Sequence, residues 1–585
     1  MSNRNAQEEN ISKLVAHFRK NEISRRDFLR FAMLLGLSYS TAQFLAACAD
    51  ETTAAPTAAP AATSPPDVSG PQKGGKLIVG CRDEVSQLNP VVAEPAREMR
   101  VSLAAAIHDS LWRLSPQGEV PNLAIEMPTV TNGGISADGL TYTVKLREDV
   151  KWHDGQPFTS EDVVFSWEAL VNPDVKSASV IGVSEIESME APDPHTVVWR
   201  MKEPYSPLIT AFADFFIVPK HILAESSDLN TDSYNASPVG TGPFIFDEWV
   251  KGSNITLKAN ENYHGTGPYV DQLIFKVIPD LTVLYTQLKT GEIDITGYQG
   301  ILVDHYEEAL TLPDIEVFTT TNPDLEVFGF NNMNPLFEDK RVKTAIYFGM
   351  DKDPIINDIW KGLPLIADTY ISRVHWAYNP NVKDYWKYDP GKSKQLLDEA
   401  GWIVGEDGIR VKDGTRLSFE NSLASGNQVR EQIQQLLQQQ FKEIGVEMII
   451  ANKPPSEMWG DFYSLSQFES YFGGQGRTIG SDPDWTWRLH SKNITAITGE
   501  GYNTMAYSNQ EVDRLLEAGT SEPDKEKRVD IYHELQEILI DDLPHCPIFH
   551  WTYIEGIKNT VKGFKPNPFA LSYGCWNPNE WWIES

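Results

Sequence analysis

The segment that decides the fold runs from residue 138 to residue 167 and reads DGLTYTVKLREDVKWHDGQPFTSEDVVFSW. In its first half, Tyr142, Val144 and Leu146 alternate with polar neighbours, which is the period of a half-buried strand. Asp138 and Gly139 directly precede this strand and form a turn signal. We therefore expect a strand over 141–147 with one face on the core.

The second half of the same segment predicts a helix. Asp154-Gly155 supplies another turn, and Thr159 is a candidate N-cap with Asp162 three residues further on. The helix is expected over 163–170. A strand followed this closely by a capped helix indicates a mixed α/β body.

The same two periods recur along the rest of the chain. One helix is expected over 429–444 and ends at Gly445, and another over 393–400 is closed by Gly401. A third helix falls at 531–539, before Pro544. Further strands are expected at 76–79, 195–201, 254–259, 273–278, 446–450 and 544–551.

The N-terminus predicts export from the cytoplasm. Residues 1–47 contain seven Lys/Arg and four Asp/Glu, a charge of +3, whereas the whole chain carries −32. Arg25 and Arg26 lie in a stretch that resembles the twin-arginine motif. The apolar run over 31–47 has 17 residues and is diluted by polar ones, which is marginal for a membrane span. Residues 1–47 are thus expected to be an export signal.

Cys48 is the predicted site of lipidation. Residues 45–48 read Leu-Ala-Ala-Cys, which resembles a bacterial lipoprotein box whose cysteine becomes the first mature residue. The alternative is an ordinary buried helix with an incidental cysteine. A durable anchor needs two or more acyl chains. The Thr-, Ala- and Pro-rich stretch that follows, within 48–73, is expected to be a flexible linker.

Composition limits the function classes. Residues 74–585 are too many for one core, so two or three lobes are expected. The strong negative charge argues against a nucleic acid or an anionic membrane surface as the ligand. Besides Cys48, the chain has Cys81, Cys546 and Cys575, which allow one internal disulfide at most.

Catalytic and metal motifs are weak in this sequence. His153 and Asp154 are adjacent and point apart, and His545, Cys546 and His550 fall in an expected buried strand, where packing is the favoured interpretation. Nucleophile elbows, phosphate loops and zinc helices do not occur as motifs, so we expect no enzyme, metal or cofactor. The remaining enzyme alternative is a secreted hydrolase with a pair of carboxylates.

Thirteen motifs in a fixed order resemble one known family. They are Leu88-Asn89-Pro90, 118–124, 138–143, Trp152-His153-Asp154-Gly155, 159–163, 238–244, Asn262-Tyr263, Gly291-Glu292-Ile293-Asp294, 337–342, Tyr388-Asp389-Pro390, Ala400-Gly401-Trp402, Ile444-Gly445-Val446 and Asp482-Pro483. Over about 75–561 the chain resembles the extracellular solute-binding proteins of family 5, the peptide/nickel type of ABC transporters. Most of these motifs are turns and caps, so they identify the family without naming the ligand contacts.

The resemblance implies an α/β fold, a two-lobed periplasmic-binding-protein clamshell of type II with an extra inserted subdomain. Lobe I is expected at 75–112, 237–322 and 536–585, the inserted subdomain at 113–236, and lobe II at 323–535. A solute would bind between the lobes, and hinge closure would bury it. The implied partners are an ABC permease and its ATPase subunits. We expect a monomer that is lipid-anchored to the outer face of the cytoplasmic membrane.

The family's peptide-binding members carry a Gly-Trp and then an Asp, which pairs with the peptide's ammonium group, shortly before an Asp-Pro. Here Gly473-Gly474 replaces the Gly-Trp, and no acid lies near Thr478. A peptide-class solute remains the main hypothesis, with Asp482 or Asp484 in the missing role, and an oligosaccharide is the alternative. Arg477 would favour an acidic group.

Five residues are therefore predicted to bind the ligand. They lie in or directly after a Gly-rich segment that mixes aromatic and polar side chains, which suits close approach of a ligand. Trp485 or Trp487 would offer a stacking face, unless the two belong to a strand and pack against the core. The predicted ligand-binding residues are Phe472, Gly474, Arg477, Asp482 and Trp485.

Overall fold

The structure is a computed structural model that describes residues 70–178, 182–297, 300–383, 385–476, 480–499, 501–570 and 573–584. The predicted export signal with Arg25 and Arg26, the predicted lipidation site Cys48 and most of the linker lie outside the described residues, as does Arg477. Residues 71–585 form one compact unit, which is the subject of all that follows.

Helices and strands alternate along this unit, with short 3-10 and π turns between them. The α-helices are α4 (Arg97–Ile107), α5 (Ser160–Val171), α6 (Leu208–Ala211), α7 (Lys220–Leu223), α8 (Leu281–Thr290), α9 (Tyr306–Ala309), α10 (Lys340–Phe348), α11 (Pro390–Glu399), α12 (Gln428–Glu443), α13 (Pro455–Glu457), α14 (Thr486–Leu489), α15 (Thr495–Thr498), α16 (Gln510–Ser521) and α17 (Lys525–Asp542). The strands are β1 (Lys76–Cys81), β2 (Trp112–Ser115), β3 (Gly118–Pro121), β4 (Thr141–Lys145), β5 (Ile186–Asp193), β6 (Thr196–Met201), β7 (Phe244–Val250), β8 (Asn254–Ala259), β9 (Gln272–Val277), β10 (Ile295–Thr296), β11 (Ile315–Phe330), β12 (Leu365–Ile366), β13 (Ile403–Val404), β14 (Arg410–Lys412), β15 (Thr415–Arg416), β16 (Ser418–Ser422), β17 (Glu447–Ile450), β18 (Ser470–Gln475), β19 (His545–Lys558), β20 (Val561–Lys562) and β21 (Trp582–Ile583).

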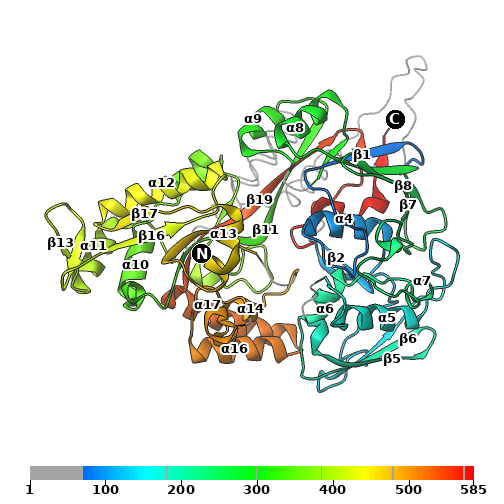
Figure 1. Ribbon diagram of the computed structural model, residues 1–585, viewed down its shortest axis with the longest axis horizontal. Coiled ribbons are helices and arrows are strands. Elements are labelled where there is room, and N and C mark those ends of the chain that lie inside the picture. The colour runs from blue at the N-terminus through cyan, green and yellow to red at the C-terminus, as the bar shows by residue number, and fades with distance from the viewer. Residues whose placement is uncertain are drawn as a thin grey trace, which may run out of the picture. The chain divides into compact units, whose positions relative to one another are not determined.

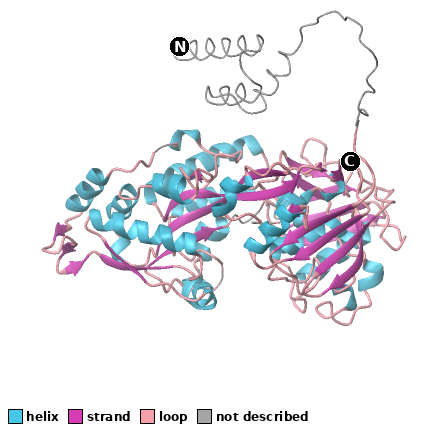
Figure 2. Ribbon diagram, turned by 90° about the horizontal axis from the view of Figure 1, so that it is seen from above, coloured by secondary structure: helices cyan, strands magenta, loops and turns pink. Residues whose placement is uncertain are grey.

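One large mixed sheet runs through the unit. Its 11 strands follow the order β17-β16-β18-β11-β19-β10-β1-β9-β8-β7, and β12 pairs with β19 at the side. The two longest strands, β11 and β19, are antiparallel neighbours. They extend from the half that contains α12 and β16 to the half that contains β1 and β8 (Figures 1 and 2). These two strands are the continuous connection between the halves.

β19 contributes to the cores of both halves. Ile548, Phe549 and Ile554 pack in a cluster with the buried face of α12, whereas Ile557 packs with β1 and β9 residues. The side chains of Ile548 and Phe549 are 0% and 1% exposed. A single strand is thus embedded in the cores of both halves.

Residues 138–167 belong to a separate layer. β4 pairs with β6, which pairs with β5, and α5 packs against this small sheet. The capping box at the start of α5 is confirmed: the side chain of Thr159 accepts from the N3 backbone, and Asp162 accepts from the N–H of Thr159. The helix begins at Ser160, three residues earlier than expected, because the capping box at Thr159 fixes its N-terminus there.

The periodic segments are confirmed as elements of the expected type. The 429–444 pattern is α12, with Ile433, Leu437 and Phe441 fully buried. Gly445 follows the helix at φ 83°, a conformation that glycine adopts without a steric penalty. The 544–551 stretch is the first half of β19, and Cys546 and His550 are buried in it.

Trp485 and Trp487 do not lie on a strand. Trp485 is the N-cap residue of the short helix α14, and Trp487 lies inside that helix with 45% of its surface exposed. In addition, α17 continues unbroken through residues 535 and 536, where the expected boundary between lobe II and lobe I falls.

Candidate ligand-binding site

A cavity of about 550 Å³ lies beside the central strands β11 and β19. Arg82, Glu98 and the 301–303 stretch line it from the half that contains β1, and the start of α12 and the end of β18 line it from the other half. Besides Arg82, Glu98 and 301–303, the lining residues come from the start of α8, from β11, β19, α12 and β18, and from the turns beside them: Leu281, Asp324, Trp360, Asn427, Val429, Arg430, Gly474, Gln475, Gly476, Trp551, Thr552, Tyr553 and Ile554. A cavity of this volume accommodates a small-molecule ligand.

A buried ion pair forms part of the cavity wall. Glu326 on β11 accepts two hydrogen bonds from Arg430 on α12, from Nε to Oε1 at 2.8 Å and from Nη2 to Oε2 at 2.9 Å. The Glu326 side chain is 0% exposed and that of Arg430 is 20% exposed. Burial raises the pKa of the Glu326 carboxyl, and the charge of Arg430 opposes this rise. The pair is bidentate, the strong form of this contact.

Aromatic rings surround the ion pair. The Arg430 guanidinium lies over the ring of Trp551, 5.1 Å from its centroid. Trp551 meets Trp360 edge to face, with centroids 5.4 Å apart. The indole N–H of Trp360 is buried and has no hydrogen-bond partner among the described residues. This wall thus combines a cation with indole rings.

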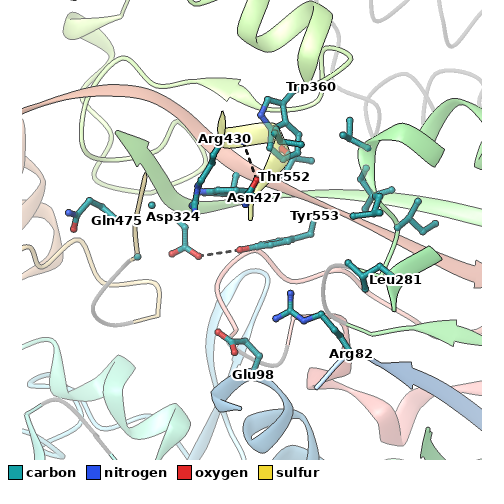
Figure 3. A pocket seen from close by; sticks show the side chains of 18 residues that line it. Arg82, Glu98, Leu281, Asp324, Trp360, Asn427, Arg430, Gln475, Thr552 and Tyr553 are labelled. Carbon is teal, nitrogen blue, oxygen red and sulfur yellow. Dashed lines mark hydrogen bonds between the residues drawn. The ribbon is translucent and has the colours of Figure 1, made fainter. Parts of the chain in front are cut away.

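Carboxylates line other parts of the cavity. Asp324 accepts hydrogen bonds from the amide of Asn322 at 2.8 Å and from the hydroxyl of Tyr553 at 3.4 Å. Figure 3 shows Asp324 and Tyr553 between Arg430 on one side and two further charged residues, Glu98 and Arg82, on the other. The cavity therefore offers charges of both signs to a ligand.

The end of β18 enters the cavity without bulky side chains. Gly474 pairs with Glu326 across the sheet, so its Cα lies directly over the ion pair. Gln475 turns inward and donates to the hydroxyl of Tyr463 at 2.9 Å. The backbone carbonyl of Gly476 accepts a hydrogen bond from Nε of Arg488 at 3.0 Å. The backbone here can approach a ligand closely.

The predicted site residues lie in different places. Gly474 lines the cavity, whereas Phe472 is 1% exposed and packs in the core with α12. Trp485 is 6% exposed and meets Tyr370 edge to face at 6.0 Å. Neither aromatic residue is among the residues that line the cavity. Their predicted contact with a ligand stays a prediction.

Asp482 is held in an ion pair of its own. Nη2 of Arg528 donates to Oδ1 of Asp482 at 2.8 Å, and the two side chains are 7% and 4% exposed. Asp484, two residues on, accepts a hydrogen bond from the hydroxyl of Tyr205 at 3.3 Å. Because Tyr205 belongs to the stretch predicted as the inserted subdomain, this segment contacts a different part of the chain from the cavity.

Sequence reasoning did not find the charged residues of the cavity. Glu326 and Arg430 are 104 positions apart, so no local spacing indicates that they pair. One usable signal was present, since a lone acidic residue interrupts the apolar run Leu325, Val327, Phe328 of a buried strand. A buried carboxylate requires a partner.

A mixed α/β body with a cavity of this size beside two connecting strands is the architecture expected of a solute-binding protein. The model of the family described as bacterial extracellular solute-binding proteins, family 5 Middle, matches residues 120–496. The chain belongs to this family, as the sequence motifs indicated, and the predicted fold class is confirmed.

Similar proteins cover almost the whole chain. The oligopeptide-binding protein AppA of Bacillus subtilis is 28% identical over 570 residues, 94% of this chain and 98% of its own. Its solved structure in complex with a nonapeptide has a TM-score of 0.70 at 27% identity and covers 88% of this chain and 100% of its own. NikZ of Campylobacter jejuni, solved in complex with Ni(L-His), has a TM-score of 0.72 at 29% identity, and covers 86% and 99% of the two chains.

Two further observations concern the described residues alone. Within them, no helix combines the length and the apolar character needed to cross a bilayer. The same residues contain no group of three or more His, Cys, Asp or Glu side chains that would hold a metal ion. Cys81, Cys546 and Cys575 are buried free thiols.

Proposed function

We propose that this protein is the solute-binding component of an ABC importer and that it captures a small peptide-class solute. The observation that carries the proposal is the cavity, which is lined by Asp324, Glu98, Arg82 and Arg430 together with indole rings. A peptide with free termini carries one charge of each sign, so it matches walls of both signs. The family membership and the relative named as an oligopeptide-binding protein support the same class.

The division into lobes is part of this proposal. Lobe I at 75–112 and 237–322, the inserted subdomain at 113–236 and lobe II from 323 would enclose the solute between them. We move the last boundary from 535–536 to the start of β19, because α17 is continuous across it. The protein would act as a monomer without catalytic turnover and hand its solute to a separately encoded permease and ATPase.

Isothermal titration with free di- to pentapeptides tests the solute class. We expect saturable 1:1 binding without cleavage of the peptide. Asp324→Asn should weaken this binding about tenfold or more, because it removes a carboxylate that lines the cavity. Asp314→Asn is the matched control, since Asp314 is exposed and does not line the cavity. Equal losses in both variants, or peptide hydrolysis by the purified protein, would contradict the proposal.

An oligosaccharide is the second candidate. The Trp360–Trp551 pair favours it, since indole rings stack on sugar rings and both residues line the cavity. Binding of cello- or manno-oligosaccharides but of no peptide in the same titration would establish this alternative.

Export and lipid anchoring at Cys48 complete the proposal. The basic segment, the twin-arginine stretch at Arg25 and Arg26 and the lipoprotein box occur in the order of an export signal. Cys48→Ser should release the protein from membranes into the soluble fraction, as measured by fractionation and immunoblotting. Unchanged membrane association would show that the anchor lies elsewhere.

A further inference from the structure

Arg430 is the part of the buried ion pair that a ligand can reach. Its side chain is 20% exposed and lines the cavity, whereas its partner Glu326 is 0% exposed. The carboxylate uses the Nε–Nη2 edge of the guanidinium and holds it in place through two hydrogen bonds. A solute in the cavity therefore meets a positioned cation whose counterion is shielded behind it.

Gly474 makes this approach possible. A Cβ at position 474 would lie 3.1 Å from Nη2 of Arg430, 3.6 Å from Oε2 of Glu326 and 3.8 Å from Nε1 of Trp551. Any larger side chain would cover the guanidinium or displace it from Glu326. The absence of a side chain at this position leaves the ion pair open to the cavity.

We propose that Arg430 binds an anionic group of the solute, namely a carboxylate, and that Glu326 is a positioning residue that takes up one proton from solvent when the carboxylate engages Arg430. This inference rests on the proposed solute-binding function and specifies the chemistry that the site selects. No bond between heavy atoms changes, and the only transfer is that of one proton from hydronium or the acid form of the buffer, which becomes its conjugate base, to a carboxylate oxygen of Glu326.

Proton uptake follows from the charges that surround Glu326. Among the described residues, Arg430 on α12 supplies a charge to Glu326, Trp551 on β19 supplies a neutral N–H, and Gly474 on β18 lies opposite Glu326 in the sheet. Burial already raises the pKa of Glu326, and Arg430 is the main group that opposes this rise. A second carboxylate on Arg430 shares its positive charge, so the pKa of Glu326 rises further. Glu326, and not the solute, takes the proton because its side chain is 0% exposed, whereas a solute carboxylate on Arg430 would lie at the cavity surface and be less desolvated.

The sign of the pH dependence follows from this linkage. A group that binds a proton more tightly in the complex makes binding stronger as pH falls. Affinity for a carboxylate-bearing solute should therefore increase from pH 8 towards pH 5.5. Simple protonation of the solute carboxylate would have the opposite effect.

Four probes test the preference for a carboxylate independently of whether the solute is a peptide or a sugar. They are trialanine, trialanine amide, cellobionate and cellobiose, titrated by calorimetry in two buffers of different ionisation enthalpy, which measures the protons taken up. Trialanine pairs with its amide, and cellobionate pairs with cellobiose. In whichever pair binds, we expect the carboxylate-bearing ligand to bind at least tenfold more tightly than its neutral counterpart and with net uptake of a proton. Binding by the sugar pair alone would reject the peptide class while still testing the carboxylate preference.

Variants of the ion pair test the roles of its two members. Glu326→Gln, the neutral isostere, should bind the carboxylate probe at least as tightly as the wild type and without proton uptake. Arg430→Met should lose the preference for the carboxylate, and Arg430→Lys should restore part of it. If Arg430→Met fails to fold because Glu326 is left buried without its partner, the double variant with Glu326→Gln removes that charge.

Asp109→Asn is the matched control, because Asp109 is a fully buried carboxylate that also pairs with an arginine, Arg113, but does not line the cavity. It should lower stability and leave both the carboxylate preference and the proton uptake unchanged. Equal affinity for the members of each pair, absence of proton uptake in the wild type, or no binding of either carboxylate probe would overturn the inference.

Discussion

Trp485 shows how an aromatic residue near a ligand segment can serve the core. Its indole is 6% exposed and lies within a hydrophobic cluster that includes Tyr370, Met505 and Leu516. The segment that carries it does reach the cavity, but earlier, at Gly474 and Gly476. Sequence position alone could not separate the two roles, because both favour aromatic side chains among glycines.

Replacing Trp485 distinguishes packing from ligand contact. We expect Trp485→Ala to lower the free energy of unfolding by about 3–5 kcal/mol, the usual cost of truncating a large buried aromatic residue. Affinity for the solute should change less than threefold. Calorimetric titration beside a thermal melt measures both quantities, and a loss of affinity at unchanged melting temperature would instead confirm the ligand contact predicted from the sequence. Trp459→Ala, at an exposed position that does not line the cavity, is the control.

Whether a residue of the candidate site could be predicted depends on how far its partners lie from it in the sequence. Gly474 was found because it lies inside a local Gly-rich motif. Glu326, Arg430 and Trp551 were missed because their pairing requires β11, α12 and β19 to be neighbours in space, which no local pattern records. A binding site assembled from distant elements is visible only once the tertiary contacts are known.

Individual elements were more predictable, since their signals are local. The cap at Thr159 and Asp162, the Gly445 stop and the period of α12 all act within one or two helical turns. β11 was the main element that sequence reasoning did not delimit. It runs for 16 residues with register shifts against β19 and contains Pro323, which breaks the usual strand pattern.

The capping box of α5 gives a prediction for this element. Thr159→Ala removes the side chain that accepts from the N3 backbone, so the free energy of unfolding should fall by about 1 kcal/mol. Thr159→Ser keeps the hydroxyl oxygen and should restore most of the stability. Urea unfolding followed by circular dichroism measures the difference, and an equal loss in both variants would show that the methyl group matters instead.

The stability of the whole unit should depend on one buried acid. Glu555 on β19 is 3% exposed, and burial raises its pKa to about 7 against the hydrogen bond from the Gly574 backbone. A folded-state pKa above the ordinary value means that the folded protein holds the proton more tightly. The stability from this group is therefore complete below pH 4.5 and is lost as pH rises through about 7.

Glu555→Gln tests this pH dependence. A rise in pKa from 4.5 to about 7 corresponds to about 3 kcal/mol in the free energy of unfolding. As pH rises from 4.5 to 8.5, the wild type should lose this amount of stability relative to the variant. Chemical unfolding at a series of pH values gives the difference curve. Glu261→Gln, at an exposed position, should give a flat curve, and a flat curve for Glu555→Gln as well would contradict the assignment.

At the scale of the whole unit, the proposed inserted subdomain contacts the proposed lobe II. Ser206 donates its backbone N–H to the carbonyl of Thr520 and its hydroxyl to the carbonyl of Glu522, both at 2.7 Å. Beside it, Tyr205 donates to Asp484, and Ser481 donates to Glu119 at 2.8 Å. These bonds join parts of the chain that the central strands do not connect, so they are the ones that opening of a clamshell would break.

If the contact forms only when the solute is enclosed, it contributes to affinity and not to the stability of the free protein. The double variant Tyr205→Phe/Ser206→Ala removes two side-chain hydrogen bonds while leaving the backbone bond of Ser206 in place. We expect affinity to fall about 5- to 30-fold, the equivalent of one to two kcal/mol for two such bonds. The melting temperature without solute should be unchanged.

Small-angle scattering supplies the independent readout. The radius of gyration of the wild type should decrease when the solute binds, and the double variant should require a higher solute concentration for the same decrease. Ser226→Ala is the control, because its hydroxyl bonds to Asp232 within the proposed inserted subdomain itself. A lowered melting temperature of the free double variant with unchanged affinity would mean that the contact is permanent. The two halves would then have to admit the solute by a motion that leaves residues 205–206 in place against lobe II.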